Sequence, residues 1–329
     1  MSTSEINVIG IGNAIVDVLA HTDDEFLQHQ ELEKGGMMLI DASRADKLYE
    51  LMGAGKEMSG GSAGNTMAGI ASLGGSGGYI GKVANDKLGT VFGDDLRSAG
   101  IEFSTSALVG GAPTARCLIL ITPDAQRTMN TFLGACVELS PEDIDPEFIK
   151  RGKVTYLEGY LYDPPKAQEA FIKAATIAHE AGRKVSLSLS DAFCVDRHRA
   201  DFLELIRKHV DILFANETEI LSLFKTDNFN AAAENVRAIC EVSALTLGDK
   251  GAVVVHAGDS LEIAAVAVES VVDTTGAGDL YAGGFLHGYS TGRELAECGR
   301  IGAIAAAEII SHTGARPETS LAERVRNSV

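Results

Sequence analysis

The sequence is poor in positive charge. Its 329 residues include 28 lysines and arginines against 46 aspartates and glutamates, which gives a formal net charge of −18. Binding to a nucleic-acid backbone needs clustered cations, so this composition argues against that class of partner. Long apolar runs are also missing, because stretches such as residues 263–268 are far shorter than the roughly 20 residues that span a bilayer. We therefore expect neither a nucleic-acid partner nor a membrane.

Cysteine pairs are missing as well. The 5 cysteines are odd in number and widely spaced, and no two form a C-x-x-C pair. The first apolar segment contains Glu5, Asn7 and Asp17 and follows no basic region, so it does not resemble a secretory signal. These features predict a reduced, cytoplasmic protein without structural zinc.

Apolar residues make up 45% of the chain, enough for a large core. From about residue 150 to 310, buried-strand candidates alternate with amphipathic helices, which is typical of βαβ units. We predict an α/β fold, a doubly wound and mainly parallel sheet with helices on both faces. Short extended segments at 15–20, 37–40, 116–121 and 127–132 predict a small β-rich insert. The large domain would comprise 1–14, 42–112 and 136–329, and the insert 15–41 and 113–135.

Glycine is abundant, with 36 residues where average usage of about 7% predicts roughly 23. The segment Gly60-Gly61-Ser62-Ala63-Gly64-Asn65 leads directly into a helical run at 66–73. Paired glycines before a helix let the backbone approach a ligand and donate to its hydroxyl groups. A tight turn capped by Ser62 is the alternative interpretation. The segment at 10–15 lacks the third glycine of a dinucleotide motif, because Ile15 occupies that position.

A second glycine segment reads Asp273-Thr274-Thr275-Gly276-Ala277-Gly278-Asp279 and precedes another predicted helix at 280–288. Consecutive small residues at a helix start leave amide groups that can hold a transferring phosphoryl group. Asp279 could accept a proton from a substrate hydroxyl, or it could simply stabilise the helix dipole.

Polar groups also follow two neighbouring strands. Asn216 and Glu219 come after the strand at 212–215, and the turn 246–251 follows the next strand. The carboxyl ends of parallel strands are where α/β sheets place ligands, and Glu219 could organise magnesium through water. A helix cap and an ordinary turn are the structural alternatives.

These four segments, in this order, resemble the ribokinase-like (PfkB) family of carbohydrate and nucleoside kinases. The resemblance covers essentially the whole chain and is nearest to the branch that acts on adenosine. It implies transfer of the γ-phosphate of ATP to the 5′-hydroxyl of a nucleoside, most simply adenosine to AMP, and it makes the β insert a lid. ATP and Mg²⁺ are the implied cofactors, with K⁺ as a possible third.

The resemblance also implies a role for each matching residue. Catalysis would use Asp279 as the base, an anion hole of Gly276, Ala277 and Gly278, and Arg127 on the phosphates. Metal ions would be held by Glu219 (Mg²⁺, through water) and by Asp273 and Thr275 (the monovalent cation). The ATP site would be lined by Asn216, Thr246, Gly248 and Gly251. The nucleoside would be bound by Asn13, Asp17, Gly61, Ser62 and Asn65 and flanked at its base by Phe132, Tyr160 and Phe193.

Two alternatives stay open at this point. A sugar kinase of the same family is one, because Glu158 is the kind of acid with which such enzymes can hold a substrate hydroxyl. A ligand sensor that keeps the fold is the other, although a sensor needs no base and metal set together. Each aromatic residue could also be an ordinary core residue at a strand end. A monomer is weakly favoured over a dimer.

Overall fold

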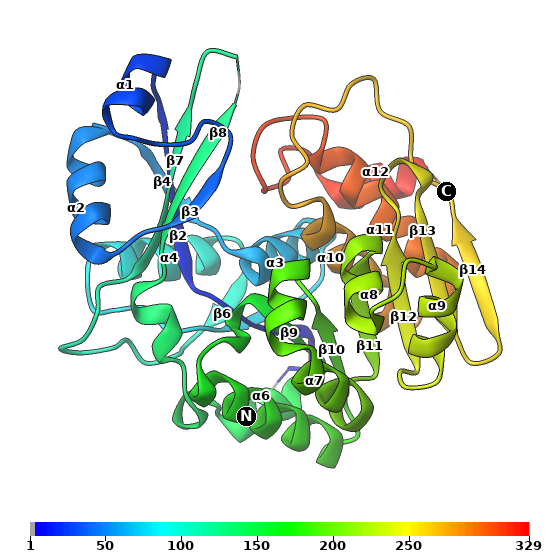
Figure 1. Cartoon of the computed structure of the whole chain (residues 1–329). Helices are drawn as coiled ribbons and strands as arrows, with labels where there is room; N and C mark the ends of the chain where they lie inside the picture. Colours follow the sequence, from blue (N-terminus) through cyan, green and yellow to red (C-terminus); the bar gives the residue numbers. More distant parts are fainter. Residues whose placement is uncertain (1–3, 125, 329) are drawn as a thin grey trace.

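A nine-stranded sheet forms the body of the molecule in the computed structural model, which describes residues 4–124 and 126–328 (Figure 1). Its strand order is β14-β13-β12-β11-β10-β9-β1-β5-β6. All pairs are parallel except β12 with β13 and β13 with β14. The strands are β1 (Ile6–Ile11), β5 (Gly77–Ile80), β6 (Ile101–Phe103), β9 (Gly152–Glu158), β10 (Lys184–Ser188), β11 (Ile212–Asn216), β12 (Val242–Thr246), β13 (Ala252–His256) and β14 (Asp259–Ile263).

Helices cover both faces of this sheet, which confirms the predicted fold class. Strand residues such as Ile9, Leu157 and Leu213 share one core cluster with the first group of helices, and Val8, Tyr156 and Phe214 share the other with the second. The first group is α5 (Pro146–Arg151), α6 (Pro165–Glu180), α7 (Ala192–His209), α8 (Glu217–Phe224) and α9 (Phe229–Arg237). The second is α3 (Ser62–Ser72), α4 (Lys87–Ser98), α10 (Ala277–Ser290) and α11 (Leu295–Ile309), with α12 (Leu321–Asn327) packed beside them.

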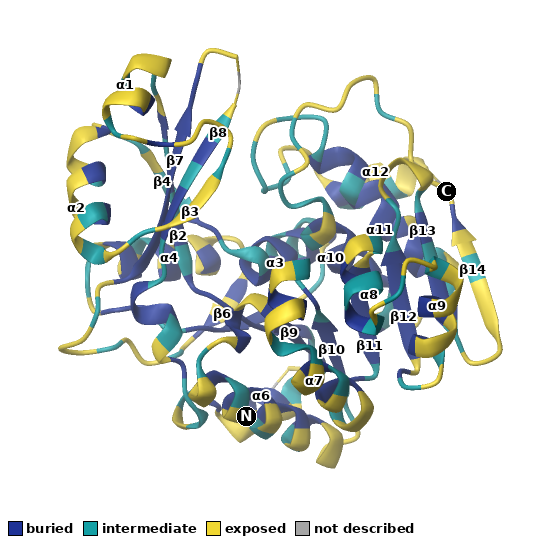
Figure 2. Cartoon of the chain, in the orientation of Figure 1, coloured by how far each residue is buried: buried dark blue, intermediate teal, exposed yellow. Residues whose placement is uncertain are grey.

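A second sheet of five strands stands at one side of the body, in the order β3-β8-β7-β2-β4. One face packs on α1 (Asp24–His29) and α2 (Ala42–Leu51), as the buried Val18, Leu27 and Leu48 show (Figure 2). The strands are β2 (Ile15–His21), β3 (Met37–Leu39), β4 (Lys56–Ser59), β7 (Ala115–Ile121) and β8 (Arg127–Phe132).

The small sheet is larger than the insert expected from the sequence. Strand β4 pairs with β2, and α2 packs on the same sheet, although both lie in the range 42–112 that we assigned to the large domain. The reason is local: Lys56-Glu57-Met58-Ser59 has no apolar alternation and buries only Ser59, so nothing in its pattern marks a strand. The first stretch of the insert therefore extends from β2 to β4.

No helix in residues 4–124 or 126–328 has both the length and the apolar character needed to cross a membrane.

Candidate active site

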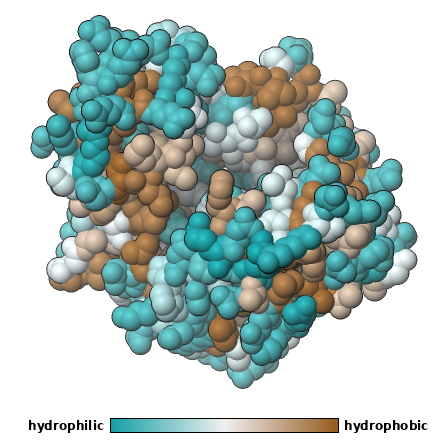
Figure 3. All heavy atoms as spheres, in the orientation of Figure 1, coloured by the Kyte–Doolittle hydropathy of each residue, from teal (hydrophilic) through white to brown (hydrophobic). Residues whose placement is uncertain are grey.

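The predicted site residues gather where the carboxyl ends of the central strands meet the small sheet. Gly12 follows β1, Tyr160 follows β9, Asn216 ends β11 and Thr246 ends β12. Helices α3 and α10 both begin in this region and pack closely on each other. The space-filling view shows the face hollowed between the small sheet and the body (Figure 3). This is the location at which open α/β sheets bind ligands.

Asp279 lies at the centre of this region, in the first turn of α10. Its two carboxylate oxygens accept hydrogen bonds from the α3 residues, Ser62 Oγ at 2.6 Å and Asn65 Nδ2 at 2.9 Å. Burial raises the pKa of Asp279, while these two donors and the guanidinium of Arg316 act in the opposite direction. The structure thus joins the predicted base to two residues predicted to bind the substrate.

The start of α10 has the form of an anion-binding turn. Gly276 is the N-cap, with φ of 80°, and no side chain caps the helix. The N–H groups of Gly278 and Asp279 have no acceptor among the described residues, whereas the N–H of Ala277 turns back to Thr274 O at 3.2 Å. The open amides and the positive end of the helix dipole favour a negatively charged group here.

Asp17 reaches the same region from β2 of the small sheet. Its carboxyl group lies so close to Gly60 that a Cβ atom on that glycine would come within 2.3 Å of Asp17 Cγ. Gly61 follows with φ of 78°, and a Cβ there would meet Asn13 O at 2.5 Å. Burial raises the pKa of Asp17 to about 6, opposed by Arg316 and Arg127 and reinforced by Asp279. The paired glycines are therefore needed for close packing against the Asp17 carboxyl group and the Asn13 carbonyl group.

Asn13 and Glu158 form a buried support beneath the site. Glu158, which is 1% exposed, accepts hydrogen bonds from Asn13 Nδ2 at 2.7 Å and from Ala63 N at 2.8 Å. Asn13 Oδ1 in turn lies 3.0 Å from Cys136 Sγ. Burial raises the pKa of Glu158 to about 7. Both side chains thus link β1, α3 and β9, and the Glu158 carboxylate is shielded from solvent.

Two of the three predicted aromatic residues project from the strand ends. Tyr160 is 42% exposed and Phe193 is 77% exposed, so the alternative that they are core residues is wrong. Their segments are joined through Ser190, whose Oγ accepts from Tyr160 N at 3.0 Å and whose φ is 72°. A non-glycine residue in the left-handed region is typical of functional sites.

Phe132 lies on the other face of the small sheet. Asp17, Cys117 and Thr131 are cross-strand neighbours on one face, whereas Phe132 pairs with Arg116 one position away, and side chains alternate between faces. The Arg116 guanidinium carbon lies 5.9 Å from the Phe132 ring centroid and 5.4 Å from that of Tyr49 on α2. The structure therefore does not bring Phe132 together with Asp17, Tyr160 and Phe193.

Arg127 links the small sheet to the segment before α10. Its Nη1 lies 2.5 Å from Asp273 Oδ2, with the two side chains 10% and 11% exposed. The same carboxylate accepts from Thr275 N at 2.9 Å and from Gly314 N at 3.0 Å. The predicted phosphate-binding arginine and the predicted cation ligand are thus bound to each other, so a monovalent ion would have to compete with Arg127 for Asp273.

Asn216 and Glu219 form a reciprocal cap at the start of α8. Glu219 Oε2 accepts from Asn216 N at 2.9 Å, and Asn216 Oδ1 accepts from Glu219 N at 2.9 Å. Burial is the largest effect that raises the pKa of Glu219 to about 7, and the negative charges of Asp191 and Asp279 raise it further. No group of three acidic, histidine or cysteine side chains in the described ranges could hold a metal by itself. This donor set fits Mg²⁺ that arrives on phosphates and keeps its waters, because Mg²⁺ seldom needs an all-protein cage.

The predicted ATP-binding turn follows β12. Gly248 has φ of 63° and Gly251 has φ of 91°, and a Cβ on Gly251 would come within 2.0 Å of Ile263 O. Both glycines are therefore required by the backbone of the turn itself, which brings the start of the loop after β14 beside the end of β12. Thr246 remains partly exposed at the strand end.

Arg316 is a site residue that no sequence pattern pointed to. It lies in the loop between α11 and α12 and donates to Ser59 and Gly64, which flank the Gly60–Gly61 turn. Its partners are more than 250 positions away in the chain, and no local motif marks it.

Comparison with known proteins agrees with this geometry. Residues 30–321 match the family model described as pfkB family carbohydrate kinase, so the chain belongs to the PfkB family. It is similar to the crystal structure of adenosine kinase from Sinorhizobium meliloti, with 51% identity, coverage of 99% of this chain and 100% of that one, and a TM-score of 0.90. A probable sugar kinase protein from Rhizobium etli is similar at 48% identity, with 99% of each chain covered and a TM-score of 0.90. Adenosine kinase from Saccharomyces cerevisiae is 26% identical, over 88% of this chain and 90% of that protein.

Membership of this family and the site together define the class of activity. The ribokinase-like fold and the kinase resemblance predicted from the sequence are confirmed. The chain is a phosphotransferase that acts on a hydroxyl group.

Proposed function

We propose that this kinase transfers the γ-phosphate of ATP to the 5′-hydroxyl of a nucleoside, with adenosine as the preferred acceptor and AMP as the product. The observation that carries the proposal is the placement of Asp279 beside the open amides of α10 and in contact with Ser62 and Asn65. A base, an anion-binding turn and hydroxyl-binding side chains are the parts that phosphoryl transfer to an alcohol requires.

The preference for a nucleoside rests on a different observation. Tyr160 and Phe193 expose aromatic surface at the strand ends, and the rings of a purine gain from stacking on such surface, whereas a sugar does not need it. The similarity to the adenosine kinase of Sinorhizobium meliloti supports the same choice.

Some residues of the site position the substrate, and others stabilise the charge of the phosphoryl group. Asp17, Ser62 and Asn65 hold the ribose hydroxyls, which places the 5′-hydroxyl beside Asp279 for removal of its proton. The open N–H groups of Gly278 and Asp279 and the Arg127 guanidinium stabilise the charge of the transferring phosphoryl group. Mg²⁺, when bound with ATP near Asn216 and Glu219, neutralises part of the phosphate charge.

Arg127 pairs with Asp273 through Nη1, so ATP phosphates would compete with this carboxylate for the guanidinium. Asp273 and Thr275 are the residues that would hold K⁺. In the absence of ATP, the hydrogen bonds of Asp273 to Arg127, Thr275 and Gly314 satisfy its carboxylate.

A sugar kinase of the same fold is the second candidate, favoured by the similarity to the probable sugar kinase of Rhizobium etli. The burial of Glu158 weighs against it, because the acid that would hold a sugar hydroxyl is 1% exposed and accepts hydrogen bonds from Asn13 and Ala63.

A panel of acceptors separates the two functions. ADP release from ATP and Mg²⁺ is measured with adenosine, inosine, guanosine, ribose and fructose at equal concentrations. We expect kcat/KM for adenosine to exceed that for either sugar by at least about 100-fold, since neither sugar has a base that can stack on Tyr160 and Phe193. Faster turnover of ribose or fructose than of adenosine would establish the sugar kinase instead.

The pH dependence of kcat/KM is a second consequence of the geometry. Burial raises the pKa of Asp17 to about 6 and also raises that of Asp279. Asp279 must be ionised to accept a proton, and Asp17 is the stronger hydrogen-bond acceptor when it is ionised. We expect kcat/KM to fall as the pH drops below about 6, with a limiting slope greater than one in a logarithmic plot because two groups titrate.

The same pKa shifts indicate that this loss of activity does not come from unfolding. An acid whose pKa is raised in the folded state favours folding below its ordinary pKa, and this contribution is lost as the pH rises through about 6. Asp17 and Asp279 therefore do not destabilise the protein at pH 5, which circular dichroism checks. A profile that stays flat from pH 5 to 8 with the fold intact would exclude both acids from the rate-determining chemistry.

A further inference from the structure

Arg316 holds both ends of the turn at residues 59–64, which we call the substrate-binding turn. Its Nη2 donates to Ser59 O at 2.6 Å and to Ser59 Oγ at 2.9 Å, and its Nη1 donates to Gly64 O at 2.9 Å. Ser59 ends β4 of the small sheet, and Gly64 lies in the first turn of α3. One side chain thus fixes the separation between the small sheet and α3, and the intervening residues are those that contact Asp17 and Asp279.

The charge of this arginine is not used in an ion pair. Its hydrogen-bond acceptors are carbonyl and hydroxyl oxygens, no ion pair within 4.0 Å includes it in residues 4–124 or 126–328, and its buried Nε has no hydrogen-bond partner there. Arg316 is partly buried, and a cation in such a place has a desolvation cost that a neutral side chain would not have. The location of its charge next to the turn at residues 59–64 therefore points to a role in the site.

Two acids of the site experience this charge. The Arg316 guanidinium lowers the pKa of both Asp17 and Asp279, against the larger effect of their burial. Asp17 is also affected by the charge of Arg127 on β8. Arg316 is affected in turn by the charges of Asp17, Asp279 and Asp95 on α4 and by the hydroxyl group of Tyr79. The negative charge of Asp279 also raises the pKa values of Glu158 and Glu219.

The residues before Arg316 connect the same loop to the start of α10. Gly314 N donates to Asp273 Oδ2 at 3.0 Å, and a Cβ on Gly276 would lie 2.8 Å from Ala315 Cβ. Three successive residues therefore contact Asp273, the anion-binding turn and the substrate-binding turn.

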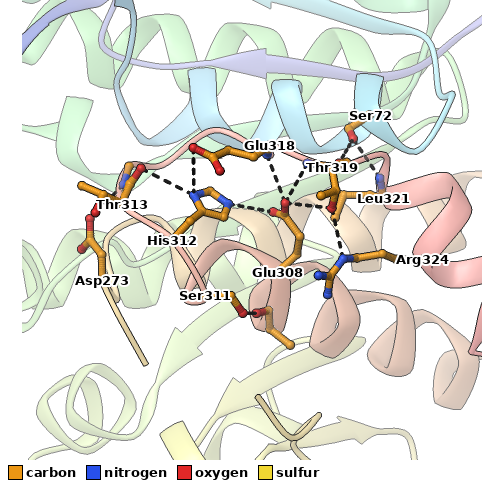
Figure 4. A network of polar contacts seen from close by, with 12 residues as sticks. Ser72, Asp273, Glu308, Ser311, His312, Thr313, Glu318, Thr319, Leu321 and Arg324 are labelled. Carbon is orange, nitrogen blue, oxygen red and sulfur yellow. Dashed lines mark hydrogen bonds and ion pairs between the residues drawn. The ribbon is translucent and has the colours of Figure 1, made fainter. Parts of the chain in front are cut away.

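The loop between α11 and α12 is held in place by hydrogen bonds to Glu308. Glu308, which is 1% exposed, accepts from Glu318 N at 3.0 Å, from Thr319 N at 2.9 Å and from Thr319 Oγ1 at 3.0 Å (Figure 4). His312 Nε2 lies 3.2 Å from the same carboxylate. The loop that contains Arg316 is therefore held by a polar network that is centred on the buried Glu308 and lies outside the site.

We propose that Arg316 is a positioning residue of the phosphoryl transfer, which fixes the turn at residues 59–64 against α3 and places a positive charge beside the part of the site that contains Asp17 and Asp279. It acts through these groups and contacts none of the predicted phosphate-binding amides. The inference rests on the proposed function in one respect, because its test uses the acceptor substrate of that function.

Two substitutions separate the positioning effect from the charge effect. Arg316→Gln removes the charge and keeps a short hydrogen-bond donor, and Arg316→Lys keeps the charge and loses the fork of donors. We expect Arg316→Gln to lower kcat/KM about 100-fold at pH 7, and to move the acidic limb of its pH profile upward by about 0.5–1 pH unit. Arg316→Lys should also lower kcat/KM, by about 10-fold, but its acidic limb should remain at the wild-type position.

Arg326→Gln is the matched control, because Arg326 lies in the same C-terminal region and its side chain is 72% exposed. Its activity and pH profile should equal those of the wild type. Melting temperatures and the affinity for the acceptor identified by the panel are measured for all variants.

The outcome decides the proposal in either case. Coincident acidic limbs for wild type, Arg316→Lys and Arg316→Gln would overturn the electrostatic role, and kcat/KM of Arg316→Gln within threefold of wild type would overturn the positioning role. If Arg316→Gln does not fold, the acidic limb of Arg316→Lys is decisive, because a shift despite the retained charge contradicts the proposal. Failure of the wild type to phosphorylate adenosine would refute the proposed function alone, since the variants can then be compared with the acceptor that is turned over.

Discussion

Asp279→Asn is expected to lower kcat by about 10²–10⁴-fold, the range typical of the loss of a general base, while nucleoside affinity changes little. Affinity should survive because the new amide can be accommodated. Its oxygen can still accept from Ser62, and its nitrogen can donate to Asn65 Oδ1 once the Asn65 amide rotates to exchange its oxygen and nitrogen, since that oxygen has no other partner in the described part of the chain. Single-turnover kinetics and equilibrium titration with the nucleoside measure the two quantities separately.

The control for this variant is Asp94→Asn, which removes an exposed carboxylate on α4 that pairs with Arg97. It should leave both quantities unchanged. If Asp279→Asn retained turnover within threefold of wild type, Asp279 would be a helix-dipole residue and the assignment of the base would be wrong.

Gly276→Ala is expected to give the second large loss, a fall in kcat of about 100-fold with a small loss of stability. The φ of 80° is strained for alanine, at about 1–2 kcal/mol, and the new methyl group would lie 2.8 Å from Ala315 Cβ. The start of α10 must therefore shift, which moves the amides that we propose to stabilise the transferring phosphoryl group. Steady-state kinetics and thermal unfolding check the two effects.

Gly292→Ala is a closely matched control, because Gly292 follows the other end of α10, has the same φ of 80° and has no atom within 4 Å of the position that a Cβ would occupy. It should lose about the same stability from backbone strain but keep the wild-type kcat. Equal losses of activity in the two variants would mean that the effect of Gly276→Ala comes from destabilisation and not from the anion-binding turn.

The central sheet and most of its helices could be predicted, because their strands are continuous apolar runs and their helices begin at capping residues. Asn216 with Glu219 is a clear case, since the spacing that suggested a ligand also forms the reciprocal cap. The contact of Asp279 with Ser62 and Asn65 could be anticipated only from the family resemblance, because 217 and 214 positions separate the partners.

Other features could not be predicted, for identifiable physical reasons. Phe132 differs from Thr131 by one position, and in β8 that step reverses the face of the sheet, which an apolar residue type alone does not specify. Arg316 acts through backbone carbonyl groups of distant residues, and carbonyl acceptors leave no mark in the sequence. Asn13 and Glu158 are polar residue types, but they bind each other in the core.

The net charge of −18 makes the local sources of positive field important for ATP binding. Arg127, Arg316 and the open amides of α10 are the groups near the site that supply this field. Their small number explains why single substitutions among them are expected to have large effects on turnover and small effects on the fold.

The most direct test of the proposed reaction compares adenosine with 5′-deoxyadenosine, which keeps the base and both ribose hydroxyls but lacks the acceptor. Each is incubated with ATP and Mg²⁺, and the products are identified by phosphorus NMR. We predict AMP and ADP in equal amounts from adenosine and no transfer to 5′-deoxyadenosine, which should instead inhibit competitively. Absence of AMP with adenosine, or phosphorylation of 5′-deoxyadenosine, would contradict transfer to the 5′-hydroxyl.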